Sequence, residues 1–370
     1  MTITIEEEWK TKTKRRNFFY FYDGNKLRHI SKIPEIKKII EIKNENKHII
    51  KYEVPENLVN NLIVFSTSNK TGNLGYNKCS LNEKNEIICN INVNIKPEMF
   101  EIDNNELRNE IEYMREMTSE MINDIKDFIK NYSLNDNFWI FMTKTRDYIS
   151  NFDEGLISTL MFPDDNQKKK SIEQVMKFIH QIWISLLIAK LLNTKQIYCS
   201  VFEQGTRKSD PPSFIFKNES NLYYLWHEYQ YIGETPSYLK NERSEFFDNG
   251  IFMWRRRDIM VIKSKTGETD FLKIKGNDFA KADLVIECKH LPIEKWLLNQ
   301  EMFDNLLKSL RAYKEFPPNT NNILLISIFE IPFDYKNRLE QEGITVIDGF
   351  HPNNLNKIKE FENYLIKILS

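Results

Sequence analysis

The sequence is poor in the residues that build nucleotide-binding loops and zinc centres. Its 370 residues include only 11 glycines, and none of the patterns G-x-x-x-x-G-K-[ST], G-x-G-x-x-G or G-x-S-x-G occurs. The chain therefore lacks the loops that hold nucleotide phosphates or present a hydrolase serine, and an ATPase that acts with it must be a separate protein. The six histidines include no pair at i, i+4, which argues against a zinc hydrolase.

Cysteine is also scarce. The four cysteines show no C-x-x-C spacing, so we expect neither a zinc site nor a disulfide framework. Cys79 and Cys89 could pair across a hairpin, although nothing else in the sequence indicates an oxidising compartment. The first residues lack the apolar core of a signal peptide. The most apolar run, residues 182–192, covers about half of a membrane span and contains Ser185 and Lys190. We therefore expect a cytoplasmic protein that does not enter a membrane.

Neither sign of charge dominates the chain. Lys and Arg number 52 against 53 Asp and Glu, which gives a formal net charge of -1. A nucleic-acid partner would have to be bound by a local basic patch, and the global charge neither supports nor excludes one. With 41% hydrophobic and 28% charged residues, the composition is typical of a globular protein, and the length allows two domains.

The amino-terminal part of the sequence indicates a small β-rich module followed by helices. Short alternating segments separated by turn residues predict strands at 18–22, 47–54, 62–66 and 86–95. Residues 104–132 carry apolar side chains at a period of 3.6, which predicts a long helix.

Two further helices are predicted before the middle of the chain. The first covers residues 138–160, and residues 161–170 interrupt the pattern. Ser171 and Gln174 have the spacing of a capping box, which predicts that an apolar helix begins there and continues to residue 192. On this helix His180 lies among apolar residues, so we expect a core or interfacial histidine rather than a ligand. We place the boundary between two domains, 1–170 and 171–370, at its start.

The second domain alternates strands with helices and predicts an α/β fold around a central mixed sheet. Strands are predicted at 197–202, 213–217, 221–232, 259–262, 284–286, 322–329 and 344–348, and helices at 238–247, 297–316 and 354–369. With its β-rich first part, the whole chain is predicted to be α+β.

Three charged residues stand at the ends of two short apolar strands in this domain. Asp258 precedes the run 259–262, and Glu287 and Lys289 follow the run 284–286. Because side chains alternate along a strand, Glu287 and Lys289 share a face. If the strands pair, Asp258 can meet them. Two carboxylates suit Mg²⁺ or Mn²⁺, and a lysine beside them can orient or deprotonate a water for attack on a phosphodiester.

These residues resemble the PD-(D/E)XK nuclease superfamily, which has the restriction-endonuclease-like fold. Asp258 matches the first aspartate of that signature, and Glu287-Cys288-Lys289 matches its acidic-x-Lys part. Arg257 stands where the family usually has proline. The resemblance covers about residues 195–350. It implies that Asp258, Glu287 and the carbonyl of Cys288 bind Mg²⁺, for which Mn²⁺ can substitute, and that Lys289 positions the attacking water.

Two further features could extend such a site. Glu228 lies on a strand rich in aromatic residues, where an unpaired charge is costly. It is a candidate for the additional acidic ligand that many superfamily members carry upstream, and the alternative is an outward or salt-bridged glutamate. Arg255, Arg256 and Arg257 lead into Asp258 and could bind the phosphates of the cleaved strand, although a basic run can also be simply solvated.

The sequence therefore predicts a metal-dependent DNA nuclease, such as one of a restriction, defence or repair system. By analogy the first domain would select the target, and a homodimer could cut both strands. One alternative is a catalytically inactive nucleic-acid-binding or scaffolding protein with a nuclease-like fold. Another is a chance match, because an aspartate followed by E-x-K is common in a lysine-rich chain.

Overall fold

The structure is a computed structural model of the chain. It describes residues 2–10, 15–44, 47–67, 74–132, 134, 138, 142, 145–194, 196–198, 212–229, 232–233, 247–248, 251–253, 257–265, 280–315 and 318–369. Two compact units are present, one formed by Met1–Tyr113 with Ser150–Ile172 and the other by Met114–Ile149 with Glu173–Ser370. The functional domains 1–170 and 171–370 stay a prediction.

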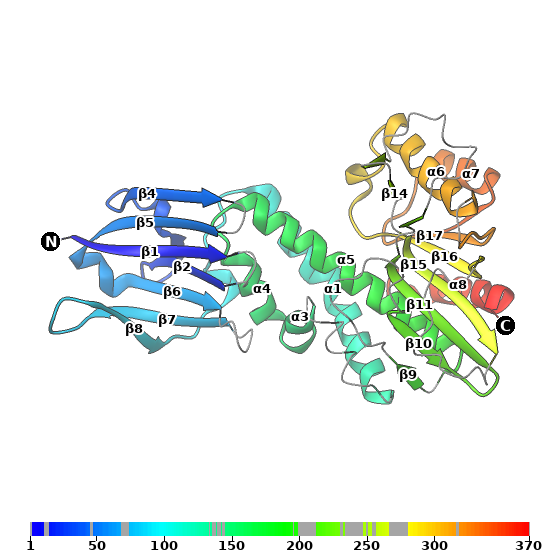
Figure 1. Ribbon diagram of the computed structural model, residues 1–370, viewed down its shortest axis with the longest axis horizontal. Coiled ribbons are helices and arrows are strands. Elements are labelled where there is room, and N and C mark those ends of the chain that lie inside the picture. The colour runs from blue at the N-terminus through cyan, green and yellow to red at the C-terminus, as the bar shows by residue number, and fades with distance from the viewer. Residues whose placement is uncertain are drawn as a thin grey trace. The chain divides into compact units, whose positions relative to one another are not determined.

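The first unit contains an eight-stranded antiparallel sheet with the order β4-β5-β1-β2-β6-β7-β8, in which β3 pairs with β2 (Figure 1). Its strands are β1 Thr2–Lys10, β2 Arg15–Tyr22, β3 Leu27–His29, β4 Lys37–Asn44, β5 Lys47–Pro55, β6 Leu62–Thr67, β7 Leu74–Leu81 and β8 Ile87–Asn92. Alternate residues such as Tyr52, Val54, Leu62 and Val64 form its core, as expected for a sheet with one covered face. The predicted β-rich module is confirmed.

A disulfide joins the last two strands of this sheet. Cys79 and Cys89 are register partners in the β7–β8 hairpin and are bonded, with their Cα atoms 4.0 Å apart. The pairing of Cys79 with Cys89, which the sequence left open, is therefore present, and this single bond is not a framework of several disulfides. Disulfides persist mainly in oxidising compartments, so the bond removes one reason for expecting a cytoplasmic protein.

The helix predicted at 104–132 is confirmed, and the helices that follow it start at other residues than predicted. The helices are α1 Asn105–Asn131, α3 Arg146–Ser150, α4 Phe152–Leu160 and α5 Asp165–Leu191. The single helix predicted at 138–160 is wrong, because the Asn151 side chain accepts a hydrogen bond from the Glu154 N–H and caps α4. Asp164 accepts the Gln167 N–H, so α5 begins where an interruption was expected, and Ser171 lies inside the helix. These are ordinary N-caps.

The second unit is built on a seven-stranded mixed sheet with the order β18-β17-β16-β15-β11-β10-β9 (Figure 1). Its strands are β9 Gln196–Tyr198, β10 Phe214–Lys217, β11 Asn221–Tyr229, β15 Arg257–Lys265, β16 Leu284–Lys289, β17 Ile323–Ser327 and β18 Ile344–Ile347. The pairs β16–β17 and β17–β18 are parallel, and the other pairs are antiparallel. The predicted central mixed sheet and the α+β class are confirmed.

Both faces of this sheet are covered. Tyr224 shares a core cluster with Phe303 of α6 (Gln300–Glu315) and Leu339 of α7 (Phe333–Gln341). The neighbouring Tyr223, which faces the other way, donates its hydroxyl to the Leu369 carbonyl of α8 (Leu355–Leu369). The central strands are therefore buried, which explains their near-continuous apolar sequences.

A small sheet with the order β12-β14-β13 completes the second unit and consists of Ile232–Gly233, Ile251–Met253 and Phe247–Asp248. The predicted helix 238–247 falls outside the described residues except at Phe247, which lies in β13. In the described part of the chain, no helix combines the length and apolar character needed to cross a bilayer.

Candidate active site

The two strands that carry the predicted motif lie side by side in the middle of the sheet. In the antiparallel pair β15–β16, Ile259 is the register partner of Ile286, so the next positions outward bring Asp258 and Glu287 to the same end of the two strands. The backbone N–H of Cys288 donates to Asp258 Oδ2 at 2.8 Å. The pairing on which the motif prediction depended is therefore present.

Glu287 is held by two neighbours. Its Oε1 lies 2.7 Å from Lys289 Nζ, and its Oε2 accepts a hydrogen bond of 2.9 Å from the hydroxyl of Tyr313 on α6. Glu287 and Lys289 meet because they share one face of β16, as the alternation of side chains predicts. Burial favours the neutral amine of Lys289, but the carboxylates of Glu287 and Asp258 outweigh burial and raise its pKa. Lys289 therefore remains an ammonium group at neutral pH.

Asp258 is an acid in an unfavourable position for charge. Only 5% of the residue is exposed. Burial and then the neighbouring carboxylate of Glu287 raise its pKa from 3.8 to about 7, while Lys177 and Lys289 partly oppose this shift. A buried carboxylate whose charge is disfavoured by burial and by a neighbouring carboxylate gains from a nearby cation or from a proton.

A lysine that the sequence did not single out bridges two of the acids. Lys177 of α5 places its Nζ 2.6 Å from Glu228 Oε1 and 3.2 Å from Asp258 Oδ1. Gln181, one turn further along α5, donates to the same Glu228 oxygen at 3.0 Å. The backbone of Glu228 has a φ of +54°. Residues other than glycine seldom adopt this left-handed conformation. Glu228 is therefore both salt-bridged and linked through Lys177 to Asp258.

Three histidines lie near these groups: His180 is buried, and His227 and His290 are partly buried. Burial lowers the pKa of His180 and His290 to about 3 and that of His227 to about 4. His180 is 1% exposed, and its two ring nitrogens have no hydrogen-bond partner among the described residues. The His227 ring meets the Ser185 hydroxyl at 2.7 Å. The expectation that His180 is a core residue is confirmed, and all three rings are neutral at neutral pH.

The predicted arginines are only partly described. Arg255 and Arg256 lie outside the described residues. Arg257 is 1% exposed, and its guanidinium carbon lies 5.4 Å from the centre of the Tyr313 ring. A buried guanidinium cannot reach a phosphate without rearrangement, so a nucleic-acid contact by Arg257 stays a prediction.

The number and kind of oxygen donors at Asp258 and Glu287 indicate whether these residues could hold Mg²⁺ or Mn²⁺. Among the described residues, no group of three or more Asp, Glu, His or Cys side chains is arranged to hold a metal ion. Mg²⁺, however, commonly uses one or two carboxylates and takes its other ligands from water and substrate. Asp258 and Glu287 at one end of adjacent strands, with the raised pKa of Asp258, fit that pattern. The Cys288 thiol is buried and its pKa is raised by burial, so only its carbonyl is a suitable donor.

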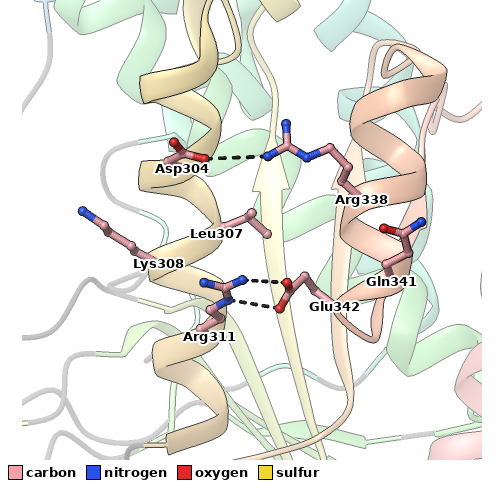
Figure 2. Close-up of a pocket in the computed structure, with 7 residues that line it drawn as sticks. All are labelled: Asp304, Leu307, Lys308, Arg311, Arg338, Gln341 and Glu342. Atoms are coloured by element: carbon pink, nitrogen blue, oxygen red, sulfur yellow. Dashed lines mark hydrogen bonds and ion pairs between the residues drawn. The ribbon is translucent and has the colours of Figure 1, made fainter.

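A hollow between α6 and α7 is lined by other residues (Figure 2). These are Asp304, Leu307, Lys308, Arg311, Arg338, Gln341 and Glu342. Arg311 makes two hydrogen bonds to Glu342, at 3.0 and 2.6 Å, and Arg338 lies 3.8 Å from Asp304. None of the predicted site residues lines the hollow, and two of its three cations face carboxylates.

Sequence reasoning missed Lys177 and Gln181 as members of the cluster. Comparisons of the chain with protein-family models, with curated proteins and with solved structures found no match.

Proposed function

We propose that the second unit is a nuclease that hydrolyses DNA phosphodiester bonds with the help of Mg²⁺ or Mn²⁺. One observation carries the proposal: Asp258, Glu287 and Lys289 come together at the ends of two central strands. Two hydrogen bonds define this arrangement. The Cys288 N–H donates to Asp258, and the Lys289 ammonium group donates to Glu287. It supports the resemblance to the PD-(D/E)XK superfamily, whose restriction-endonuclease-like fold remains part of the proposal.

The acids would hold the metal. Asp258, Glu287 and the carbonyl of Cys288 are the proposed ligands, and Glu228 is a further candidate. When bound, the ion would act as a Lewis acid on the phosphate and lower the pKa of a coordinated water. The Tyr313 hydroxyl fixes one oxygen of Glu287, so this carboxylate is oriented before any ligand arrives, which limits the reorganisation that catalysis requires.

Lys289 would act as a positive charge in the metal-free protein. Its raised pKa keeps the ammonium protonated, so it can donate a hydrogen bond to water or to a phosphate oxygen. An ammonium group has no lone pair, so it cannot accept a proton in this form. Orientation of the attacking water and its deprotonation both stay proposed roles of Lys289 once a metal ion shares the carboxylates.

A catalytically inactive nucleic-acid-binding protein is the second candidate. It is favoured by the Lys177 ammonium, which already supplies a cation to Asp258 and Glu228. Target selection by the first unit, a homodimer and a separate ATPase partner also remain proposals.

The test is cleavage of plasmid and single-stranded DNA, with RNA as a further substrate, in Mg²⁺ or Mn²⁺. Asp258→Ala and Lys289→Ala are each expected to abolish cleavage. Asp334→Ala and Lys308→Ala remove exposed residues of the same types from α7 and α6 and are expected to cut as the native protein does. If the native protein binds DNA but does not cleave it, the second candidate function is favoured. If Asp258→Ala and Lys289→Ala both still cleave DNA, the proposed catalytic residues are wrong.

A further inference from the structure

Each carboxylate oxygen of Asp258 and Glu287 already has a partner within the protein. Asp258 Oδ2 accepts the Cys288 N–H, and Asp258 Oδ1 lies 3.2 Å from Lys177 Nζ. The oxygens of Glu287 are bonded to Lys289 and Tyr313. The acids are therefore satisfied by hydrogen bonds and ammonium groups in the form described, and an arriving cation must share oxygens with them.

Of the two lysines, Lys177 is better placed to give way. Its side chain is 28% exposed, whereas that of Lys289 is 21% exposed and lies 5.6 Å from the centre of the Trp296 ring. Lys177 approaches Asp258 at 3.2 Å but Glu228 at 2.6 Å. A small shift of its ammonium group would free Asp258 Oδ1 while the shorter contact with Glu228 remained.

We propose that Lys177 is an internal cation that competes with the divalent metal ion for Asp258 and thereby weakens metal binding at the site. This inference rests on the proposed function. Glu228 then has a defined role, because it anchors Lys177 beside the site and need not bind metal itself. It would be a positioning residue, and Gln181, which donates to the same oxygen, would support it.

The physical reason is repulsion between like charges. A divalent ion that binds Asp258 Oδ1 lies close to the Lys177 ammonium, in surroundings where charges interact more strongly than in water. Replacing Lys177 with an uncharged residue of similar length removes the competitor and is expected to tighten metal binding by about tenfold or more.

The experiment measures Mn²⁺ binding directly on the full chain, by titration calorimetry and by the electron paramagnetic resonance signal of free Mn²⁺. Measurement at about pH 8.5 keeps the carboxylates ionised. Lys177→Met is expected to bind Mn²⁺ about ten times more tightly than the native protein, whereas Lys177→Arg keeps the charge and should stay within about threefold of it. Lys170→Met, an exposed lysine two turns earlier on α5, is the matched control and should bind as the native protein does.

Asp258→Asn separates failure of this inference from failure of the proposed function. If it weakens Mn²⁺ binding and Lys177→Met does not tighten it, the inference is overturned and the proposed metal site stands. If Asp258→Asn does not weaken Mn²⁺ binding, alone or combined with Lys177→Met, then the further inference and the proposed metal site are both overturned. A thermal unfolding curve for each variant verifies folding, and Lys177→Arg binding as tightly as Lys177→Met would also contradict competition by charge.

Discussion

Asp258 is expected to destabilise the metal-free protein at neutral and alkaline pH, and Asp258→Asn to relieve this cost. The folded state raises the pKa of Asp258 from 3.8 to about 7, so at intermediate pH it holds a proton that the unfolded state releases. Stability from this group is fully present below the unfolded pKa and is lost as the pH rises through the folded value. Asparagine resembles the neutral acid at every pH.

The size of the effect follows from the shift. A difference of about 3 pKa units corresponds to about 4 kcal/mol of unfolding free energy. That figure is an upper limit, because the charges of Glu287, Lys177 and Lys289 respond to the change. Asparagine can still accept the Cys288 N–H, so this hydrogen bond is retained. We therefore expect Asp258→Asn to be more stable by about 2 to 4 kcal/mol at about pH 8, and nearly equal to the native protein at about pH 4.

The assay is urea unfolding followed by tryptophan fluorescence, with a chelator present. Five of the six tryptophans belong to the second unit, so the signal reports mainly on the fold that contains the site. Asp334→Asn, at an exposed position on α7, controls for the loss of a carboxylate. Equal stabilities of Asp258→Asn and the native protein at both pH values, or a difference that does not change with pH, would refute the reasoning.

Three other perturbations test neighbouring parts of the molecule. Tyr313→Phe leaves a buried oxygen of Glu287 without its donor, so it should lower stability by about 1 to 3 kcal/mol and reduce DNA cleavage; an unchanged urea midpoint would contradict this. Reducing the Cys79–Cys89 disulfide should cost the first unit about 2 to 3 kcal/mol, measured as a reductant-dependent urea midpoint that a double serine variant no longer shows. Burial lowers the pKa of His180 from 6.5 to about 3, so the native protein loses stability as the pH falls below 6.5. His180→Phe should reduce the loss between about pH 6.5 and pH 5 by about 2 kcal/mol, and equal losses would show that the ring can be protonated in place.

The parts of the site that lie on strands could be predicted from local sequence. The apolar runs of β15 and β16 marked buried strands, and the two-residue alternation placed Glu287 and Lys289 on one face. The structure shows both features, with 2.7 Å between the two side chains. The meeting of Asp258 with this pair required only that the strands be neighbours, which is common for strands that follow each other along the chain.

The contribution of α5 could not be found in the same way. Lys177 belongs to a helix that is far from β15 in the sequence, and no local pattern distinguishes it from the other lysines of the chain. Its position follows from how α5 packs against the sheet, which periodicity alone does not determine. The start of α5 did carry a signal, because Asp164 and Gln167 have the spacing of an N-cap and its partner. Choosing Ser171 instead of Asp164 moved the expected start by two turns.

The burial of Asp258 and Glu287 bears on whether the motif is a chance match. An aspartate and an E-x-K sequence that matched by accident would be expected to direct their charges into water, because burying a charge is costly. Here Asp258 and Glu287 are 5% and 9% exposed, and their oxygens are held by Lys177, Lys289, Tyr313 and a backbone N–H. Apolar residues of similar volume often stabilise a fold as well as or better than a buried network of carboxylates and ammonium groups. Such a network is therefore weak evidence for stability, which leaves room for the proposed binding role of this end of the sheet.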